Sequence, residues 1–115
     1  MGNVQPRLRV PEYNEGQSFT ATFKFFDSNY VPSSPTTLRY RIDCLTTRAQ
    51  VLDWTTVTPA ATVSISVSPD DNKIQNTNNK RERKQMVVQT NYGTSTQGVE
   101  TKEWDILNLQ GVISG

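Results

Sequence analysis

The sequence has no histidine among its 115 residues and only one cysteine, Cys44. Without histidine, the chain has no imidazole general base, no Ser-His-Asp triad, no Cys-His dyad and no histidine-ligated metal. A single cysteine forms no intrachain disulfide, and a single thiol does not hold zinc or an iron–sulfur cluster. We therefore predict a protein that is not an enzyme, uses no cofactor or metal, and is stabilised by packing.

Long apolar runs and a strong charge excess are also missing. No apolar stretch approaches the length of a membrane span, and residues 1–10 lack the hydrophobic core of a signal peptide. Pro6 stands where a myristoylation site needs Ser or Thr. Twelve basic and eleven acidic groups leave a net charge of +1. These absences predict no membrane contact and make nucleic acid an unlikely partner.

The residues that are abundant favour a single hydroxyl-rich β domain. Val and Thr dominate, Ala is scarce, and such residues fit pleated, half-buried strands better than helices. Apolar residues alternate with polar ones in several short segments that are separated by Pro, Gly, Asn and Asp. This pattern predicts seven strands and no helix, at about residues 8–10, 18–26, 38–44, 51–57, 62–68, 82–90 and 98–107.

The alternation also predicts the core and the connections. Residues 68–72 form a turn, Ile74 is tucked under a polar loop, and Cys44 is a small buried hydrophobe. In the last strand the apolar parity changes, which predicts a bulge near Lys102. The core is expected to contain Phe19, Phe23, Tyr40, Ile42, Val63, Ile65, Met86, Val88 and Trp104.

Seven short strands in about a hundred residues are typical of an immunoglobulin-like β-sandwich with antiparallel strands. A small barrel with the same strand count is the alternative. We expect the sandwich domain over residues 13–107, an N-terminal arm with the short first strand over residues 1–12, and a C-terminal tail over residues 108–115.

Two groups of side chains are candidates for a partner interface. Arg39 and Arg41 lie on the outer parity of their strand, and Trp54 is flanked by polar residues in an expected edge strand. The alternatives are exposed cross-strand ion pairing for the arginines and a core position for the tryptophan. The second group is the basic run Lys80, Arg81, Arg83 and Lys84, interrupted by Glu82. This run is either a solvated loop leading into a strand, a contact for an acidic protein surface, or a patch that binds nucleic-acid phosphates.

No set of carboxylates indicates catalysis or metal binding. Asp70 and Asp71 are adjacent in a turn after Pro69, where Asp serves turn formation. The remaining strand carboxylates show no sign of the paired arrangement of a glycosidase. The spaced oxygen ligands of an EF-hand are absent as well.

Four segments carry a resemblance to a known group of proteins: residues 13–23 (YNEGQSFTATF), 35–43 (PTTLRYRID), 52–65 (LDWTTVTPAATVSI) and 81–88 (RERKQMVV). Together they resemble small immunoglobulin-like structural proteins of tailed bacteriophages. The resemblance implies a virion component, assembled in the host cytoplasm, that acts as a head decoration or cement subunit or as a neck or tail component. It implies contacts with the major capsid protein or with neck or tail subunits, in many copies or as a symmetric homo-oligomer. We expect the two terminal segments to lie on neighbouring subunits.

A second hypothesis comes from another functional class. Trp54, Tyr30 and Tyr92 are aromatic residues in expected edge strands, loops and turns, and aromatic rings of this kind stack on sugars. The alternative is therefore a carbohydrate-binding or host-adhesion module. An enzyme is the third and most remote hypothesis.

Overall fold

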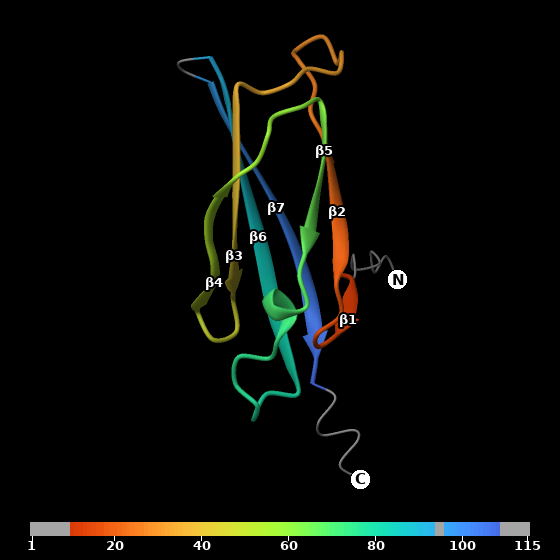
Figure 1. The fold of residues 1–115 in the computed structure, drawn as a ribbon, viewed down its shortest axis with the longest axis vertical. Helices are drawn as coiled ribbons and strands as arrows, with labels where there is room; N and C mark the ends of the chain where they lie inside the picture. The colour runs from red at the N-terminus through yellow and green to blue at the C-terminus, as the bar shows by residue number, and fades with distance from the viewer. Residues whose placement is uncertain (1–9, 94–95, 109–115) are drawn as a thin grey trace, which may run out of the picture.

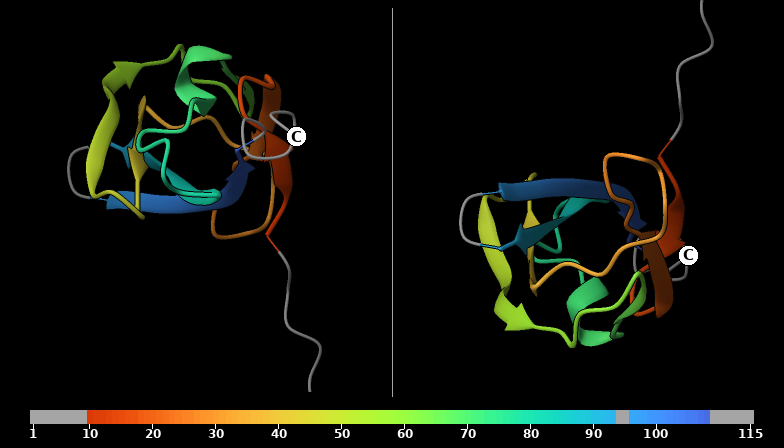
Figure 2. Two further views of the ribbon diagram at one scale, coloured as in Figure 1. Left: turned by 90° about the horizontal axis from the view of Figure 1, so that it is seen from below. Right: turned by 90° about the horizontal axis from the view of Figure 1, so that it is seen from above.

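The computed structural model describes residues 10–93 and 96–108. Seven strands form two sheets, a five-stranded sheet in the order β1-β7-β6-β3-β4 and a two-stranded sheet of β2 and β5 (Figure 1). Seen end on, the strands surround one interior (Figure 2). The prediction of an all-β chain with seven strands is confirmed. The elements are β1 Glu12–Asn14, β2 Phe19–Lys24, β3 Thr37–Cys44, β4 Ala49–Thr56, β5 Thr62–Val67, the 3₁₀ turn η1 Asp70–Asn72, β6 Arg81–Tyr92 and β7 Thr96–Leu107.

The first strand differs from the prediction in position and direction. β1 runs parallel to β7, with Glu12 opposite Asp105, so the strands are not all antiparallel. Val10 precedes β1, and Leu8 lies outside the described residues. Side chains at Glu12 and Tyr13 explain the placement. Glu12 pairs with Arg81 at 2.6 Å, and the Tyr13 ring stacks on Phe19 with centroids 4.2 Å apart.

The core lies between the two sheets, as the alternation predicted. The Phe19 ring is partly buried and packs in a T-shaped arrangement with the fully buried Trp104 ring, with the ring centroids 5.0 Å apart. Tyr40 is also only partly buried. Cys44 has 0% exposure, which confirms its prediction as a small buried hydrophobe, and Ile74 is buried under its loop. The other expected core residues are buried: Phe23, Ile42, Val63, Ile65, Met86 and Val88.

The long hairpin of β6 and β7 shows that the expected bulge near Lys102 is wrong. The two strands pair without interruption from Arg81 opposite Leu107 to Tyr92 opposite Thr96. Trp104 faces the interior, while Val99 is 62% exposed. The apparent change of parity therefore arises because Val99 is an apolar residue on the outer face. The register shifts occur instead between β3 and β4, around Ile42.

Candidate interaction surface

Arg39, Arg41 and Trp54 meet on the outer face of the five-stranded sheet; we call these three residues the Arg–Trp cluster. The two arginines alternate along β3 with the buried Leu38 and Ile42, so their side chains point away from the core. The carbon at the centre of the Arg39 guanidinium lies 4.2 Å from the centroid of the Trp54 ring, and that of Arg41 lies 5.6 Å away. Such stacking holds long cationic side chains in a fixed position.

The two arginines of this cluster differ in their charge partners. Arg41 donates to both carboxylate oxygens of Asp43, at 3.0 and 2.7 Å, and this hydrogen bonding raises the pKa of Arg41 above its ordinary value. Arg39 donates from Nε to Oε1 of Gln89 at 2.5 Å and has no carboxylate partner among the described residues. The positive charge of Arg39 is therefore held in place but left uncompensated.

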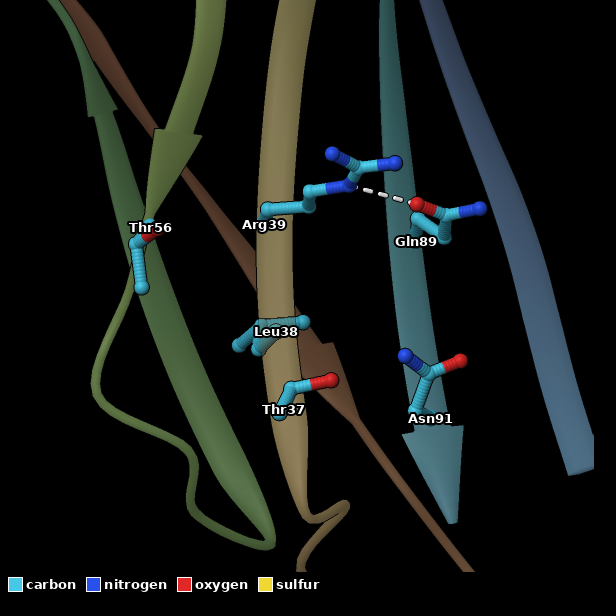
Figure 3. Close-up of a pocket in the computed structure, with 6 residues that line it drawn as sticks. All are labelled: Thr37, Leu38, Arg39, Thr56, Gln89 and Asn91. Atoms are coloured by element: carbon cyan, nitrogen blue, oxygen red, sulfur yellow. Dashed lines mark hydrogen bonds between the residues drawn. The ribbon is translucent and has the colours of Figure 1, made fainter. Parts of the chain in front are cut away.

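A hollow of about 310 Å³ lies beside Arg39 (Figure 3). The side-chain oxygen of Asn91 is buried and has no hydrogen-bond partner within the described chain. An oxygen with so little accessible surface is covered by the protein itself, so the group that a partner can reach at this hollow is the exposed guanidinium of Arg39. The hollow is lined by Thr37, Leu38, Arg39, Thr56, Gln89 and Asn91.

Arg81 and Arg83 lie on the same outer face but are compensated by carboxylates. Arg81 pairs with Glu12, and more distantly with Asp105 at 3.7 Å. Arg83 donates to the two oxygens of Asp105 at 2.8 and 3.2 Å, and this hydrogen bonding raises the pKa of Arg83. The two guanidinium groups therefore join β6 to β7 and β1 across the sheet. The neighbouring Lys80 precedes β6 and is exposed.

Lys84 contradicts the prediction that it belongs to a surface patch. Its side chain is fully buried, as is that of Glu82, and its ammonium lies 3.5 Å from a Glu82 oxygen without a hydrogen bond of its own. Glu82 accepts hydrogen bonds from the backbone N–H groups of Gln75 and Asn76, at 2.6 and 2.8 Å, and from the Asn79 amide at 3.0 Å. Burial raises the pKa of Glu82, but these bonds and Lys84 together outweigh it, so its pKa lies below the ordinary value. The basic run is thus split between the two faces of β6.

The structure therefore brings five of the seven predicted interface residues onto one face, the five other than Lys80 and Lys84. Sequence reasoning missed Gln89 and Asn91, which complete the hollow. The signal that could have found Gln89 is its parity, because it alternates in β6 with the buried Val88 and Thr90.

Two of the aromatic residues of the carbohydrate hypothesis share a different hollow, of about 360 Å³. Tyr30 and Tyr92 line it together with Phe26 and Val99. Tyr30 is 87% exposed and has a φ of 63°. Trp54 is not among the residues that line this hollow.

Within residues 10–93 and 96–108, no three Asp, Glu, His or Cys side chains converge to hold a metal ion. The same part of the chain contains no helix long and apolar enough to cross a membrane. No protein-family model, curated protein or solved structure matches this sequence or fold.

Proposed function

We propose, first, that the two sheets form a reduced immunoglobulin-like sandwich. In that fold, strands G, F, C and C′ lie side by side in one sheet, and strands B and E pair in the other. The order β7-β6-β3-β4 and the pair β2-β5 follow this arrangement when β2 to β7 are equated with B, C, C′, E, F and G. Only five residues, 57–61, connect β4 to β5, and no strand D lies between them.

We propose, second, that the chain is a non-enzymatic structural subunit of a tailed-phage virion, and most specifically a head decoration or cement subunit. The observation that carries the binding role is Arg39, an uncompensated cation stacked on Trp54 beside a polar hollow. Arg and Trp are the residue types that most often dominate the binding energy of protein interfaces. The resemblance to phage structural proteins supplies the choice of particle.

The charge distribution suggests which part of the face meets the partner. Arg41, Arg81 and Arg83 are each paired with carboxylates of this chain, so they gain little from a further anionic partner. Arg39 has no carboxylate partner among the described residues, and it lies beside the hollow. We therefore propose a capsid-protein segment that offers a carboxylate to Arg39. A neck or tail subunit with the same group is the alternative neighbour.

Cryo-electron microscopy of native particles tests the location, because it shows whether the chain is present, in how many copies and against which neighbour. Binding of the purified chain to particles that lack it tests the surface. We expect Trp54→Ala and Arg39→Ala to weaken binding on the order of 30-fold, as truncation of interface anchors does. Lys73→Ala is the control, because Lys73 is exposed, directly follows η1 and pairs with Asp70 at 3.1 Å. Absence of the chain from native particles would contradict the proposed location. Equal binding by the native chain and all variants would contradict the proposed surface.

A carbohydrate-binding role is the second candidate, because Tyr30 and Tyr92 line one hollow. An exposed ring beside a second aromatic residue provides a stacking surface for a sugar. Glycan-array binding by the purified chain, lost in Tyr30→Ala and retained in Trp54→Ala, would favour this role. Binding to particles that Trp54→Ala weakens and Tyr30→Ala leaves unchanged would favour the structural role.

A further inference from the structure

The outer edge of β5 is an open hydrogen-bonding edge. In the part of the chain that the structure describes, β5 pairs only with β2, in a register that places Thr22 opposite Ser64. The N–H of Phe25 donates to the carbonyl of Ala61 at 2.8 Å, which continues this register by one pair. Hydrogen-bonded pairs alternate along antiparallel strands, so the backbone groups of Thr62, Ser64 and Ser66 point away from β2. They have no partner among the described residues.

This edge also lacks the features that usually protect an edge strand. Natural edges are protected by charge, proline, bulges or short length. β5 has the sequence TVSISV, with no charge and no proline, and its pairing with β2 is unbroken. The other edges are protected: β1 has three residues, β2 ends in Lys24, and β4 contains Asp53 and shifts register against β3.

We propose that a second copy of this chain pairs with β5 in antiparallel orientation, about a two-fold axis that passes through Ser64. In this register Ser64 faces Ser64 of the second copy, and Thr62 faces Ser66 of the second copy. All three residues have outward-pointing backbone groups, so every outward N–H and C=O finds a partner. The interface is isologous, as closed dimers require.

The side chains of β5 suit a second copy better than an unrelated peptide. On the outer face, Thr20 and Ser66 hydroxyls lie 3.3 Å apart, and Thr22 and Ser64 hydroxyls lie 3.2 Å apart. Self-pairing of β5 continues this band of Thr and Ser hydroxyls across the axis. On the inner face Val63 meets Ile65 of the second copy, and no charged side chain within β5 opposes another.

The pairing also removes a weakness of the fold. Two-stranded sheets are marginal by themselves, and β2 with β5 forms the whole second sheet. Joining two such sheets edge to edge gives one continuous sheet across the dimer. This inference does not depend on the proposed virion role, because it concerns a different sheet from the Arg–Trp cluster.

Sedimentation equilibrium of the full chain tests the proposal with matched charge variants. Ser64→Lys brings two ammonium groups together at the axis, so we expect the dimer dissociation constant to rise at least tenfold. Thr22→Lys is the control, because it places the same charge directly opposite on β2, away from the axis. Mixing Ser64→Lys with Ser64→Glu should restore a heterodimer, since only a two-fold axis at this residue brings the two side chains together.

Three results would overturn the proposal. The first is a folded native chain that stays monomeric at several hundred micromolar. The second is a dimer that Ser64→Lys and Thr22→Lys affect equally, because the contact then lies elsewhere. The third is slow hydrogen exchange of the Ser64 amide in a monomer, because another segment of the same chain then covers the edge.

Discussion

The buried pair of Glu82 and Lys84 leads to a prediction about which of the two charges the fold requires. Both side chains are fully buried on the inner face of β6, 3.5 Å apart. Glu82→Gln removes the negative charge and leaves the Lys84 ammonium in the interior without a counter-ion. Breaking a buried ion pair from one side typically costs about 3–5 kcal/mol of unfolding free energy. Glu82→Gln also weakens the hydrogen bonds that hold the loop at Gln75 and Asn76.

Removing the other partner should cost far less. Lys84 makes no hydrogen bond, whereas Glu82 retains three N–H donors after Lys84→Met. Methionine keeps most of the apolar stem of the lysine side chain and removes the desolvation cost of the ammonium. We therefore expect Lys84→Met to lower the unfolding free energy by much less than Glu82→Gln does, because three N–H donors still compensate the charge of Glu82. The two single substitutions should be unequal by several-fold.

Urea unfolding followed by circular dichroism measures this asymmetry. With a slope of about 2 kcal/mol per molar urea, Glu82→Gln should lower the midpoint by about 2 M. Lys84→Met should lower it several-fold less. Lys84→Met added to Glu82→Gln should recover much of the loss, because no unpaired ammonium remains. Glu103→Gln is the control for loss of a half-exposed, ion-paired carboxylate, because Glu103 of β7 lies 3.7 Å from Arg83. Equal losses for the two single variants would refute the reasoning.

Three further predictions concern the same sheet. The pKa of Glu82 is lowered in the folded state, so its contribution to stability is complete above the unfolded value of about 4.5 and is lost as the pH falls through the folded pKa. Urea midpoints between pH 7 and pH 2 should show this loss, and Glu82→Gln should reduce it. Arg83→Lys should destabilise the fold by less than about 1 kcal/mol, because it loses the two-point contact with Asp105 in a half-exposed position. Faster hydrogen exchange in β7 would be the local sign, and unchanged exchange would contradict the bridging role. Cys44 is fully buried, so a thiol reagent should label it only as fast as the fold opens, and labelling at the rate of a free thiol would show an open interior.

The strands could be predicted from the sequence because their alternation reflects burial directly. In β5, Val63 and Ile65 are buried while Ser64 is exposed, as a period of two requires. The same reasoning placed Ile74 under its loop, since an isolated apolar residue in a polar segment needs cover. These features depend on local pattern alone.

The burial of Lys84 could not be predicted by treating the basic run as a unit of charge. Its parity matches the buried Met86 and Val88, so the alternation did contain the signal. By the usual rules, however, the charge of Lys84 predicts an exposed side chain, because an isolated ammonium is rarely buried. The deciding factor is tertiary: the loop after η1 folds over β6 and supplies N–H donors that keep Glu82 ionised beside Lys84.

The parallel placement of β1 depends on similarly distant partners. Glu12 meets Arg81 of β6, and Tyr13 meets Phe19 of β2, so no local pattern indicates which strand the segment joins. The position of Trp54 is another case. Its neighbours in the sequence are polar, but two arginines from β3 cover its ring, which makes it half-buried on an outer face.

These ion pairs and stacking contacts give the outer face of the five-stranded sheet an uneven capacity for binding. At the β1 end, Glu12 and Asp105 already occupy the guanidinium groups of Arg81 and Arg83, and breaking those pairs would cost stability. At the other end, Arg39 is positioned by Trp54 and Gln89 without a carboxylate. Preorganised side chains lose little entropy when a partner arrives, so binding energy should concentrate there. The arginine charges are compensated by carboxylates near β1 and uncompensated at Arg39. This difference specifies both where an anionic partner binds on the face and how it is oriented.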